Sequence, residues 1–591
     1  MDIALEHALS IVVALPAAVA LLLLTCGLAA SFVGYSGFPV SVWRAVGLAT
    51  SVLTFGLSVG VIWLGFDPAL IGLQGVETFG GLSGFGARIQ LGLDGIALCF
   101  FLSTTALVPL AILASIEETE ESIRSWIFLC LLLETSLLGT IAATNFMTYL
   151  FFWALTILPV LLWLGLFGGE ERTRAANRVW VTEAMGLAGL LFVAFVLRDL
   201  SVEQLGFATL DLASGAGAGL SPGGSGFEDA GRTLLDVKIE RADQATLLLA
   251  MSIALALRFP LVPFHFWLPG VHSAAPTGLS VLLATGFVQT AAMGVLRFAL
   301  PLFPDAVEAA GPALSIVGIS ALAYASLVAL VQKELKRLVA YASVGYAGFA
   351  IFGISTLNVQ GVTGAVMQLL MHGLATAGLF VLIGVLAKRR GTTEVAAFGG
   401  LAKPMPVCAF FFGLMVLSLM GLPLLGGFVG DLFVLVGSLE TRRALSVVAL
   451  IAMVLSASYL LWVQRRIYLG PVDEPANRGL IDLDRVERGV LLAMAIPLVV
   501  IGVYPNPVLR RVEPAVLEIF HQMEVRSVSL PAVEPESEPP ATKAKRSKRD
   551  SGKGKSQSRP KRDRGAAADV DVVRSPQSAN ESRIASLEGA P

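Results

Sequence analysis

A short stretch near the middle of the chain gathers residues that can carry charge. Residues 258–277 read RFPLVPFHFWLPGVHSAAPT and place an arginine, two histidines and four prolines between apolar runs. Ionisable side chains inside a bilayer are costly and are tolerated mainly where they face a polar cavity or a partner. Each proline removes a backbone donor and disturbs the preceding turn, so a helix that enters here must break. The stretch therefore predicts a discontinuous membrane helix at the centre of an ion path.

The same spacing also fits a simpler arrangement. The prolines would then mark a loop between two spans, with His265 and His272 at the membrane interface. Histidine titrates near neutral pH, buried glutamate and lysine can be shifted to do so, and arginine stays protonated. These residue types suit proton transfer, but their spacing alone leaves both arrangements open.

The composition excludes a soluble globular protein. The 591 residues are 55% hydrophobic and 15% charged, with a mean hydropathy of +0.76. The N-terminal segment lacks the basic residues of a secretory signal and its apolar run is long enough to span, so we expect a retained first helix. Four cysteines stand singly in apolar runs and predict neither a disulfide framework nor an iron–sulfur site; they are Cys26, Cys99, Cys130 and Cys408.

Apolar runs predict an all-α polytopic membrane protein with about fourteen transmembrane helices. Two of them are interrupted, the seventh at the stretch above and the twelfth at GLPLLGG, residues 421–427. Paired discontinuous helices are typical of transporters built from inverted repeats. The expected spans lie near residues 8–33, 43–65, 93–116, 124–143, 147–168, 179–197, 244–262, 274–300, 312–332, 336–356, 360–387, 404–438, 444–466 and 488–505.

Basic residues favour the loops that follow odd-numbered spans, which the positive-inside rule places in the cytoplasm. An even number of spans then puts both termini outside, on the periplasmic side of a bacterial membrane.

We expect residues 1–84 to hold the first two spans and residues 85–510 to form the core. The tail, residues 525–591, is basic and poor in hydrophobic residues, which predicts disorder. It has no aromatic residue, so we expect no nucleic-acid partner.

The run FPLVPFHFWLPGVHSAAPTGLSVLLATGFVQTAAMGVLRF, residues 259–298, resembles the signature of the proton-translocating membrane subunits of respiratory complex I, the NADH:quinone oxidoreductase. This family includes the Mrp-type cation/proton antiporter subunits, and the chain is most similar to its chain M branch (NuoM). The similarity extends from about Phe85 to Asn506 and includes LKRLVAYASVGYAGF (335–349) and GLPLLGGFVGDLFVL (421–435).

The resemblance implies a central row of charged residues, from which this chain departs. Ala154 stands where the family has a glutamate on the fifth helix, and Arg258 replaces the lysine of the broken seventh helix. Gln289 replaces the lysine of the eighth helix, whereas Asp431 keeps the carboxylate of the twelfth. The other positions that the resemblance marks as proton-path candidates are Glu134, His265, His272 and His372.

An arginine buried without a counter-charge would be strongly destabilising. We therefore expect either Glu134 or Glu183 to pair with Arg258, within the ~6 Å over which a charge acts strongly. Three of these candidates could instead have purely structural roles. His372 could be an ordinary buried histidine, Asp431 could cap the second half of the broken helix, and Glu183 could lie at the membrane interface.

The resemblance implies a membrane subunit that translocates protons, driven by electron transfer in partner subunits. No nucleotide-binding or metal-ligand motif is present in the sequence. NADH, FMN, iron–sulfur clusters and quinone are therefore expected in partner chains, with chain L-like and chain N-like neighbours in a bacterial inner membrane. Ala154 and Gln289 leave open a scaffold that no longer pumps, or a divergent second copy of chain M. A subunit of a stand-alone antiporter or ion-coupled uptake system is a further alternative.

Overall fold

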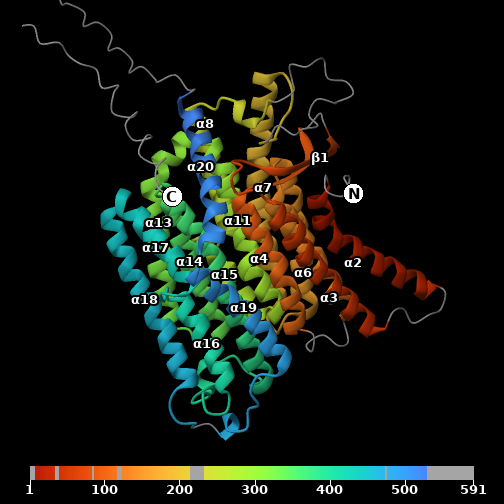
Figure 1. Cartoon of the computed structure of the whole chain (residues 1–591), viewed down its shortest axis with the longest axis vertical. Coiled ribbons are helices and arrows are strands. Elements are labelled where there is room, and N and C mark those ends of the chain that lie inside the picture. The colour runs from red at the N-terminus through yellow and green to blue at the C-terminus, as the bar shows by residue number, and fades with distance from the viewer. Residues whose placement is uncertain are drawn as a thin grey trace, which may run out of the picture. The chain divides into compact units, whose positions relative to one another are not determined.

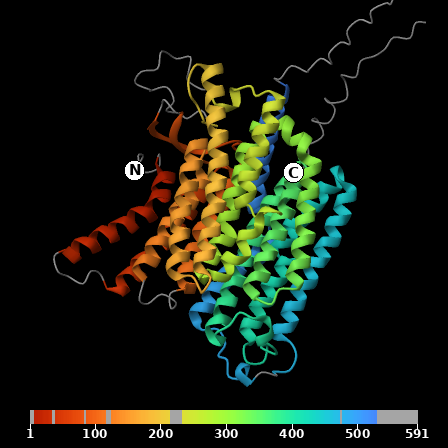
Figure 2. The same ribbon diagram turned by 180° about the vertical axis from the view of Figure 1, so that it is seen from behind.

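The computed structural model describes residues 7–32, 39–82, 86–115, 123–212, 232–472 and 475–528. Most of them lie in helices that pack side by side into one bundle (Figure 1, and from behind in Figure 2). Its first part consists of α2 (Ala8–Phe32), α3 (Val40–Leu57), η1 (Ser58–Trp63), β1 (Gln74–Leu82), β2 (Ala87–Leu93), α4 (Gly95–Ser115), α5 (Ile123–Ala142), α6 (Phe146–Phe167), α7 (Arg172–Leu205), η4 (Leu234–Asp236), α8 (Arg241–Arg258), η5 (Phe264–Trp267) and α9 (Leu268–Ala274).

One long helical series follows and is interrupted twice by π-helical turns. It consists of α10 (Thr277–Leu282), η6 (Leu283–Phe287), α11 (Val288–Met293), η7 (Gly294–Ala299) and α12 (Leu300–Leu302). The remaining elements are α13 (Pro304–Leu330), α14 (Leu335–Ile354), α15 (Val359–Arg390), η8 (Val395–Ala397), α16 (Pro406–Leu419), α17 (Gly426–Thr441), α18 (Arg443–Tyr468), η9 (Pro475–Asn477), α19 (Arg485–Val503) and α20 (Asn506–Val528).

The polytopic helical fold is confirmed. Within the described residues, twelve helices are long and apolar enough to cross a membrane, compared with the fourteen spans expected. The difference lies at the seventh and twelfth expected spans, which are divided between α8 and α9 and between α16 and α17. Each half is too short or too charged to count as a span by itself.

The first break follows α8, as the prolines predict. The helix ends at Arg258, and the chain re-enters a helical path only at Phe264. Backbone carbonyls freed by such a break must find partners inside the protein. The indole Nε1 of Trp267 donates a 2.6 Å hydrogen bond to the Leu257 carbonyl, and the backbone N–H of Leu261 donates to Ala256. The break is therefore held by the segment that follows it.

The second break lies between α16 and α17. Gly421 adopts a left-handed φ of 70°, which favours glycine, and the hydroxyl of Tyr346 on α14 donates to the freed Leu419 carbonyl. A Cβ on Gly427 would lie 2.0 Å from the Ser418 carbonyl oxygen, so the two halves approach more closely than a larger residue would permit. The predicted second discontinuous helix is thus confirmed.

Glycines also set the packing of α17 against α15. Cβ atoms built on Gly364 and Gly430 would lie 2.4 and 2.6 Å from backbone nitrogen atoms of the opposite helix. Small residues at such contacts let two membrane helices bring their backbones together. The second broken helix is therefore fixed against α15, which is buried along most of its length.

A β-hairpin corrects the expectation of an all-α chain. Strands β1 and β2 pair antiparallel, with Thr78 opposite Gln90, immediately before α4. Glu77 on β1 accepts hydrogen bonds from the backbone N–H groups of Leu9 and Ser10 at the start of α2. A carboxylate at a helix N-terminus pairs with the free amides there. The hairpin thus fixes the first helix to the bundle.

Helix α20 was not expected, since the predicted core ended at residue 510. It packs against α4 and α15, at the front of the bundle in Figure 1. Near its end, Arg526 donates to the carbonyls of Leu234, Leu235 and Val237. Burial lowers the pKa of Arg526 to about 10, so the side chain remains charged at neutral pH. Residues 529–591, on which most of the predicted disordered tail falls, lie outside the described residues.

The loops that follow even-numbered spans lie together at one end of the bundle, and the loops that follow odd-numbered spans lie together at the other end. Asn145 follows the fourth expected span. Its side-chain amide donates to the Gly86 carbonyl, in the loop after the second span, and to Asp211, in the loop after the sixth span. At the other end, Glu334 bridges to Glu394, and Arg390 donates to Asn477. This arrangement agrees with the predicted order of crossings. Which end faces the cytoplasm remains a prediction from the loop charges.

Candidate functional site

A buried ion pair joins α7 to the end of α8. The Nε of Arg258 donates a 2.9 Å hydrogen bond to Oε2 of Glu183, and its Nη2 contacts the same oxygen. The side chains are 0% and 1% exposed, respectively. Of the two partners expected for Arg258, the structure selects Glu183. The Glu183 side chain lies inside the bundle and not on its surface.

Further contacts hold the guanidinium on its other sides. Nη2 donates to the Thr156 hydroxyl at 2.7 Å and to the Trp153 carbonyl at 3.3 Å. The central carbon of the guanidinium lies 3.4 Å from the centre of the Trp153 ring and 4.5 Å from that of Phe287. A cation over an aromatic face is stabilised, most strongly when desolvated. The Thr156 and Trp153 contacts come from α6, the helix that also carries Ala154, whereas Phe287 lies in η6.

The depth of Glu183 follows from the true start of α7. The helix begins at Arg172, seven residues before the expected span. Glu183 is therefore eleven residues into the helix, or about 16 Å along its axis. Apolar periodicity could not locate this start, because the first two turns carry arginines that resemble a loop.

Glu134 on α5 is not the partner of Arg258. The residue is fully buried, and within the described part of the chain neither carboxylate oxygen has a hydrogen-bond partner. One turn further, Leu137 packs against Gly286 in the series that carries Gln289. A buried carboxyl group without a hydrogen bond is costly and must be neutral or meet water.

Gln289 accepts a hydrogen bond from another helix. The Ser103 hydroxyl on α4 lies 2.9 Å from Oε1 of Gln289, while the Gln289 amide nitrogen is buried and finds no partner in the described parts of the chain. An amide side chain can orient water through such a free donor but cannot take up a proton at neutral pH. The structure thus gives the eighth-span position a polar group that does not titrate.

The two histidines near the first break, His265 and His272, contact different residues. His272 stacks on Phe380 with ring centres 4.4 Å apart. Both of its ring nitrogens are buried and make no hydrogen bond to any described residue. Lys336 lies close enough to interact with it electrostatically and donates to the Ala275 carbonyl. His265 instead contacts the rings of Tyr324 and Tyr341 at the side of the bundle.

A second cluster forms around the other broken helix. Nε2 of His372 lies 3.1 Å from the Thr376 hydroxyl, and its ring centre is 4.5 Å from that of Tyr346. Asp431 on α17 is 4% exposed and close enough to Tyr346 to interact electrostatically. A Cβ on Gly421 would meet Oδ2 of Asp431 at 2.5 Å, so the carboxyl lies against the break itself. The structure therefore brings together His372, Tyr346 and Asp431.

Tyr346 was not a predicted site residue. Its sequence context, VGYAG, does not indicate that its hydroxyl donates to a carbonyl freed by the break in a helix more than seventy residues away. Ser103 and Thr156 were missed for the same reason. Hydroxyl residues are common in membrane helices, and only tertiary structure shows which of them meet an ionisable group.

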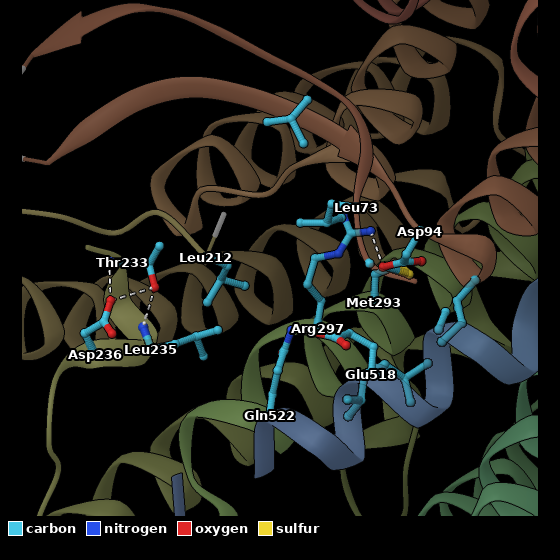
Figure 3. Close-up of a pocket in the computed structure, with 16 residues that line it drawn as sticks. Leu73, Asp94, Leu212, Thr233, Leu235, Asp236, Met293, Arg297, Glu518 and Gln522 are labelled. Atoms are coloured by element: carbon cyan, nitrogen blue, oxygen red, sulfur yellow. Dashed lines mark hydrogen bonds and ion pairs between the residues drawn. The ribbon is translucent and has the colours of Figure 1, made fainter. Parts of the chain in front are cut away.

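A polar cavity of about 510 Å³ lies at the hairpin end of the bundle. Figure 3 shows Arg297 and Asp94 on one side of it, and Asp236, Glu518 and Gln522 lining other parts. Nη2 of Arg297 donates to Asp94 at 2.6 Å, and its Nη1 donates to the carbonyls of Ile141 and Ala143 at the end of α5. Arg297 comes eight residues after Gln289 in the α10–α12 series, or about 12 Å along it.

Comparison with known proteins places this geometry in a family. Residues 143–456 match the family model for the transmembrane region of NADH:quinone oxidoreductase and Mrp antiporter subunits. Subunit M of the NADH-quinone oxidoreductase of Rhodobacter capsulatus is 33% identical over 475 residues, covering 80% of this chain and 90% of that relative. The chain belongs to this family. Chain 4 of the NADH-ubiquinone oxidoreductase of Chondrus crispus is 30% identical, with 79% and 90% coverage.

Solved structures of family members share the whole fold. A chain of respiratory complex I from Thermus thermophilus with bound NADH matches with a TM-score of 0.74 and 28% identity, covering 87% of this chain and 99% of that one. A chain of the Mrp complex from Dietzia sp. DQ12-45-1b matches with a TM-score of 0.73 at 18% identity, covering 88% and 99%, which shows the fold alone. The resemblance read from the sequence is thus confirmed.

The resemblance predicts a glutamate on the fifth helix and a lysine at the break of the seventh. In this chain the buried ion pair is formed by Glu183 of α7 and Arg258 of α8. The counter-charge is retained, but the cation can no longer lose its proton. The groups of the buried site that can still titrate are Glu134, Glu183, His272, His372 and Asp431.

Proposed function

We propose that the chain is the M-type membrane subunit of an NADH:quinone oxidoreductase and translocates protons. The observation that carries the proposal is the set of buried ionisable groups at both broken helices of a chain with subunit M relatives. Buried ionisable groups in a membrane bundle are costly and mark ion or proton pathways. Discontinuous helices supply the polar backbone groups and cavities that such a pathway needs.

The residues divide into groups that exchange protons and groups that fix the local field. Arg258 stays protonated, so it acts as a fixed positive charge that pairs with Glu183. Asp431 and His372 both lie next to Tyr346 at the second break, where water can carry a proton from one to the other. Gln289 takes the role of a water-orienting group between the two breaks.

The polar cavity at the hairpin end supplies the access that a proton path requires. Its wall carries Asp94, Asp236 and Glu518, which favour cations, and the Arg297 ion pair lies on the side toward Gln289. Acidic groups at a cavity mouth raise the local concentration of cations, including hydronium. We assign this cavity to the exchange of protons and water with the aqueous phase at that face.

The redox chemistry is assigned to partner chains. NADH, FMN, iron–sulfur clusters and quinone would bind there, and the neighbours in the membrane would be chain L-like and chain N-like subunits. The bacterial subunit M relatives support placing the chain in a bacterial inner membrane. The basic loops at the opposite end of the bundle place the hairpin end outside.

One alternative has a specific observation in its favour. Gln289 cannot titrate, and Arg258 is fixed by Glu183, Thr156 and Trp153, so the chain could retain the family's shape without pumping. The intact carboxyl groups of Glu134 and Asp431 favour translocation, because both are buried and a pure scaffold has no use for buried acids.

Purification through a tag on this chain tests the proposal. We expect flavin, iron–sulfur clusters and NADH:quinone reductase activity to copurify, and vesicles of the complex to take up protons when NADH is oxidised. Copurification of a membrane complex without reductase activity would overturn the assignment to an oxidoreductase. Reductase activity with proton uptake unaffected by substitutions in this chain would favour the scaffold.

A further inference from the structure

An apolar cavity opens on the side of the bundle between α3, α4, α15 and α19. Its volume is about 290 Å³, and its lining includes Leu102 and Leu110 of α4, Leu374 of α15 and Pro497 of α19. Along α4 the lining runs from Cys99 to Leu110, which corresponds to about 16 Å of helix. One leaflet contributes half of the ~30 Å hydrocarbon thickness of a bilayer. The cavity therefore has the depth of one acyl chain.

A cation lies at one end of this cavity. The guanidinium carbon of Arg511, on α20, is 3.8 Å from the centre of the Trp63 ring, and Trp63 lines the cavity. Nη1 of Arg511 donates to a carbonyl of its own helix, at Pro507, while Nε is buried and has no hydrogen-bond partner among the residues that the structure describes. A Cβ on Gly95 would overlap the Arg511 carbonyl, so α20 and the start of α4 are in direct contact there.

These features together suit a phospholipid. Tryptophan and arginine are typical of the level of the bilayer headgroups, and a guanidinium pairs well with phosphate. A helix is at least ~10 Å across and would not fit a cavity of this volume, whereas an acyl chain would. We propose that the cavity binds one acyl chain of an anionic phospholipid, whose phosphate pairs with Arg511.

A lipid bound in this cavity would also affect the buried site at Gln289. Ser103 lines the cavity, and its hydroxyl donates to Gln289. A bound acyl chain would cover Ser103 from the lipid side and keep water from reaching Gln289 by that route. This consequence rests on the proposed function, whereas the binding site itself does not.

Photolabelling of the intact complex tests the site. The complex is placed in nanodiscs that contain phosphatidylglycerol with a photoactivatable group in one acyl chain, and labelled peptides are mapped by mass spectrometry. We expect labels on α4 and α19. Arg511→Gln should lower this labelling about tenfold, as expected on losing a charge-assisted pair. Ala106→Phe, which fills the cavity, should lower it similarly.

Two matched variants and a competition series complete the test. Arg510→Gln removes the same charge from an exposed neighbouring position, and Ala444→Phe adds a ring at an exposed position of α18, so both should label as the wild type does. In the wild type, unlabelled phosphatidylglycerol should displace the probe, whereas phosphatidylcholine should do so only weakly and inorganic phosphate should not. Undiminished labelling of Arg511→Gln, or equal displacement by phosphatidylcholine, would overturn the proposal. Labelling requires no proton movement, so its outcome is independent of the proposed function.

Discussion

The guanidinium of Arg258 and the carboxylate of Glu183 form a direct ion pair at the point where α8 breaks, with 2.9 Å between Nε and Oε2. The residues are 75 positions apart in the sequence and both are buried. The pair joins α7 to the end of α8. The buried arginine therefore has a counter-charge, although Ala154 on α6 offers none.

Glu183→Gln should destabilise the subunit by about 3–5 kcal/mol, because it leaves Arg258 buried without a counter-charge. Thermal unfolding of the purified complex and its yield after detergent extraction would measure the loss. Glu171→Gln is the matched control, since Glu171 pairs with Arg174 at the surface and such pairs contribute about 0–1 kcal/mol.

Replacing both partners should recover much of that loss. A double variant with Glu183→Leu and Arg258→Met removes both charges, and apolar substitution of a buried ion pair is often neutral. If Glu183→Gln alone is as stable as the wild type, the pair does not balance the buried charge and this description of the site is wrong.

Gly430→Ala should weaken the packing of α17 on α15, because the added Cβ would lie 2.6 Å from the Gln368 backbone nitrogen. Overpacking of this kind costs about 1–3 kcal/mol. Gly489→Ala on α19 has no atom within 4 Å of its new Cβ and should be neutral or slightly stabilising. Equal melting temperatures for the two variants would argue against the close approach.

Trp267→Phe should loosen the first broken helix. It removes the donor to the Leu257 carbonyl and leaves that acceptor buried, at a cost of about 1–3 kcal/mol. Limited proteolysis and thermal unfolding would detect the change. Trp180→Phe, at an exposed position of α7, serves as the control and should have no effect. A Trp267→Phe variant as resistant as the control would show that another group satisfies the carbonyl.

Gln289→Leu should slow proton transfer without unfolding the subunit. Ser103 loses its acceptor on Gln289 but still donates to the Phe100 carbonyl, so no new unpaired donor is created. Because Gln289 orients water and does not titrate, the loss should be smaller than that caused by removing an acid. Proton uptake and NADH oxidation would be measured side by side, and unchanged uptake would exclude Gln289 from the path.

The sequence correctly predicted the features in which a residue acts on the backbone next to it. Prolines 260 and 263 and the glycines near residue 421 predict both breaks, because each acts on its own turn of helix. The partner of Arg258 was narrowed to two acids, but choosing between them required the three-dimensional structure. Tyr346 was missed, since its role depends on a carbonyl of a distant helix. The hairpin and α20 were missed because their polar residues resemble loops until the surfaces they cover are known.

The central claim is that the acid at the second break takes part in proton transfer. The most direct measurement is the ratio of protons taken up to NADH oxidised, in vesicles of the native complex, for Asp431→Asn and His372→Ala. Glu440→Gln, which neutralises an exposed acid near the end of the same helix, is the control. We predict a lower ratio for Asp431→Asn and His372→Ala and an unchanged ratio for the control, with assembly intact in all three. An unchanged ratio for Asp431→Asn would contradict the account and leave the chain as a scaffold.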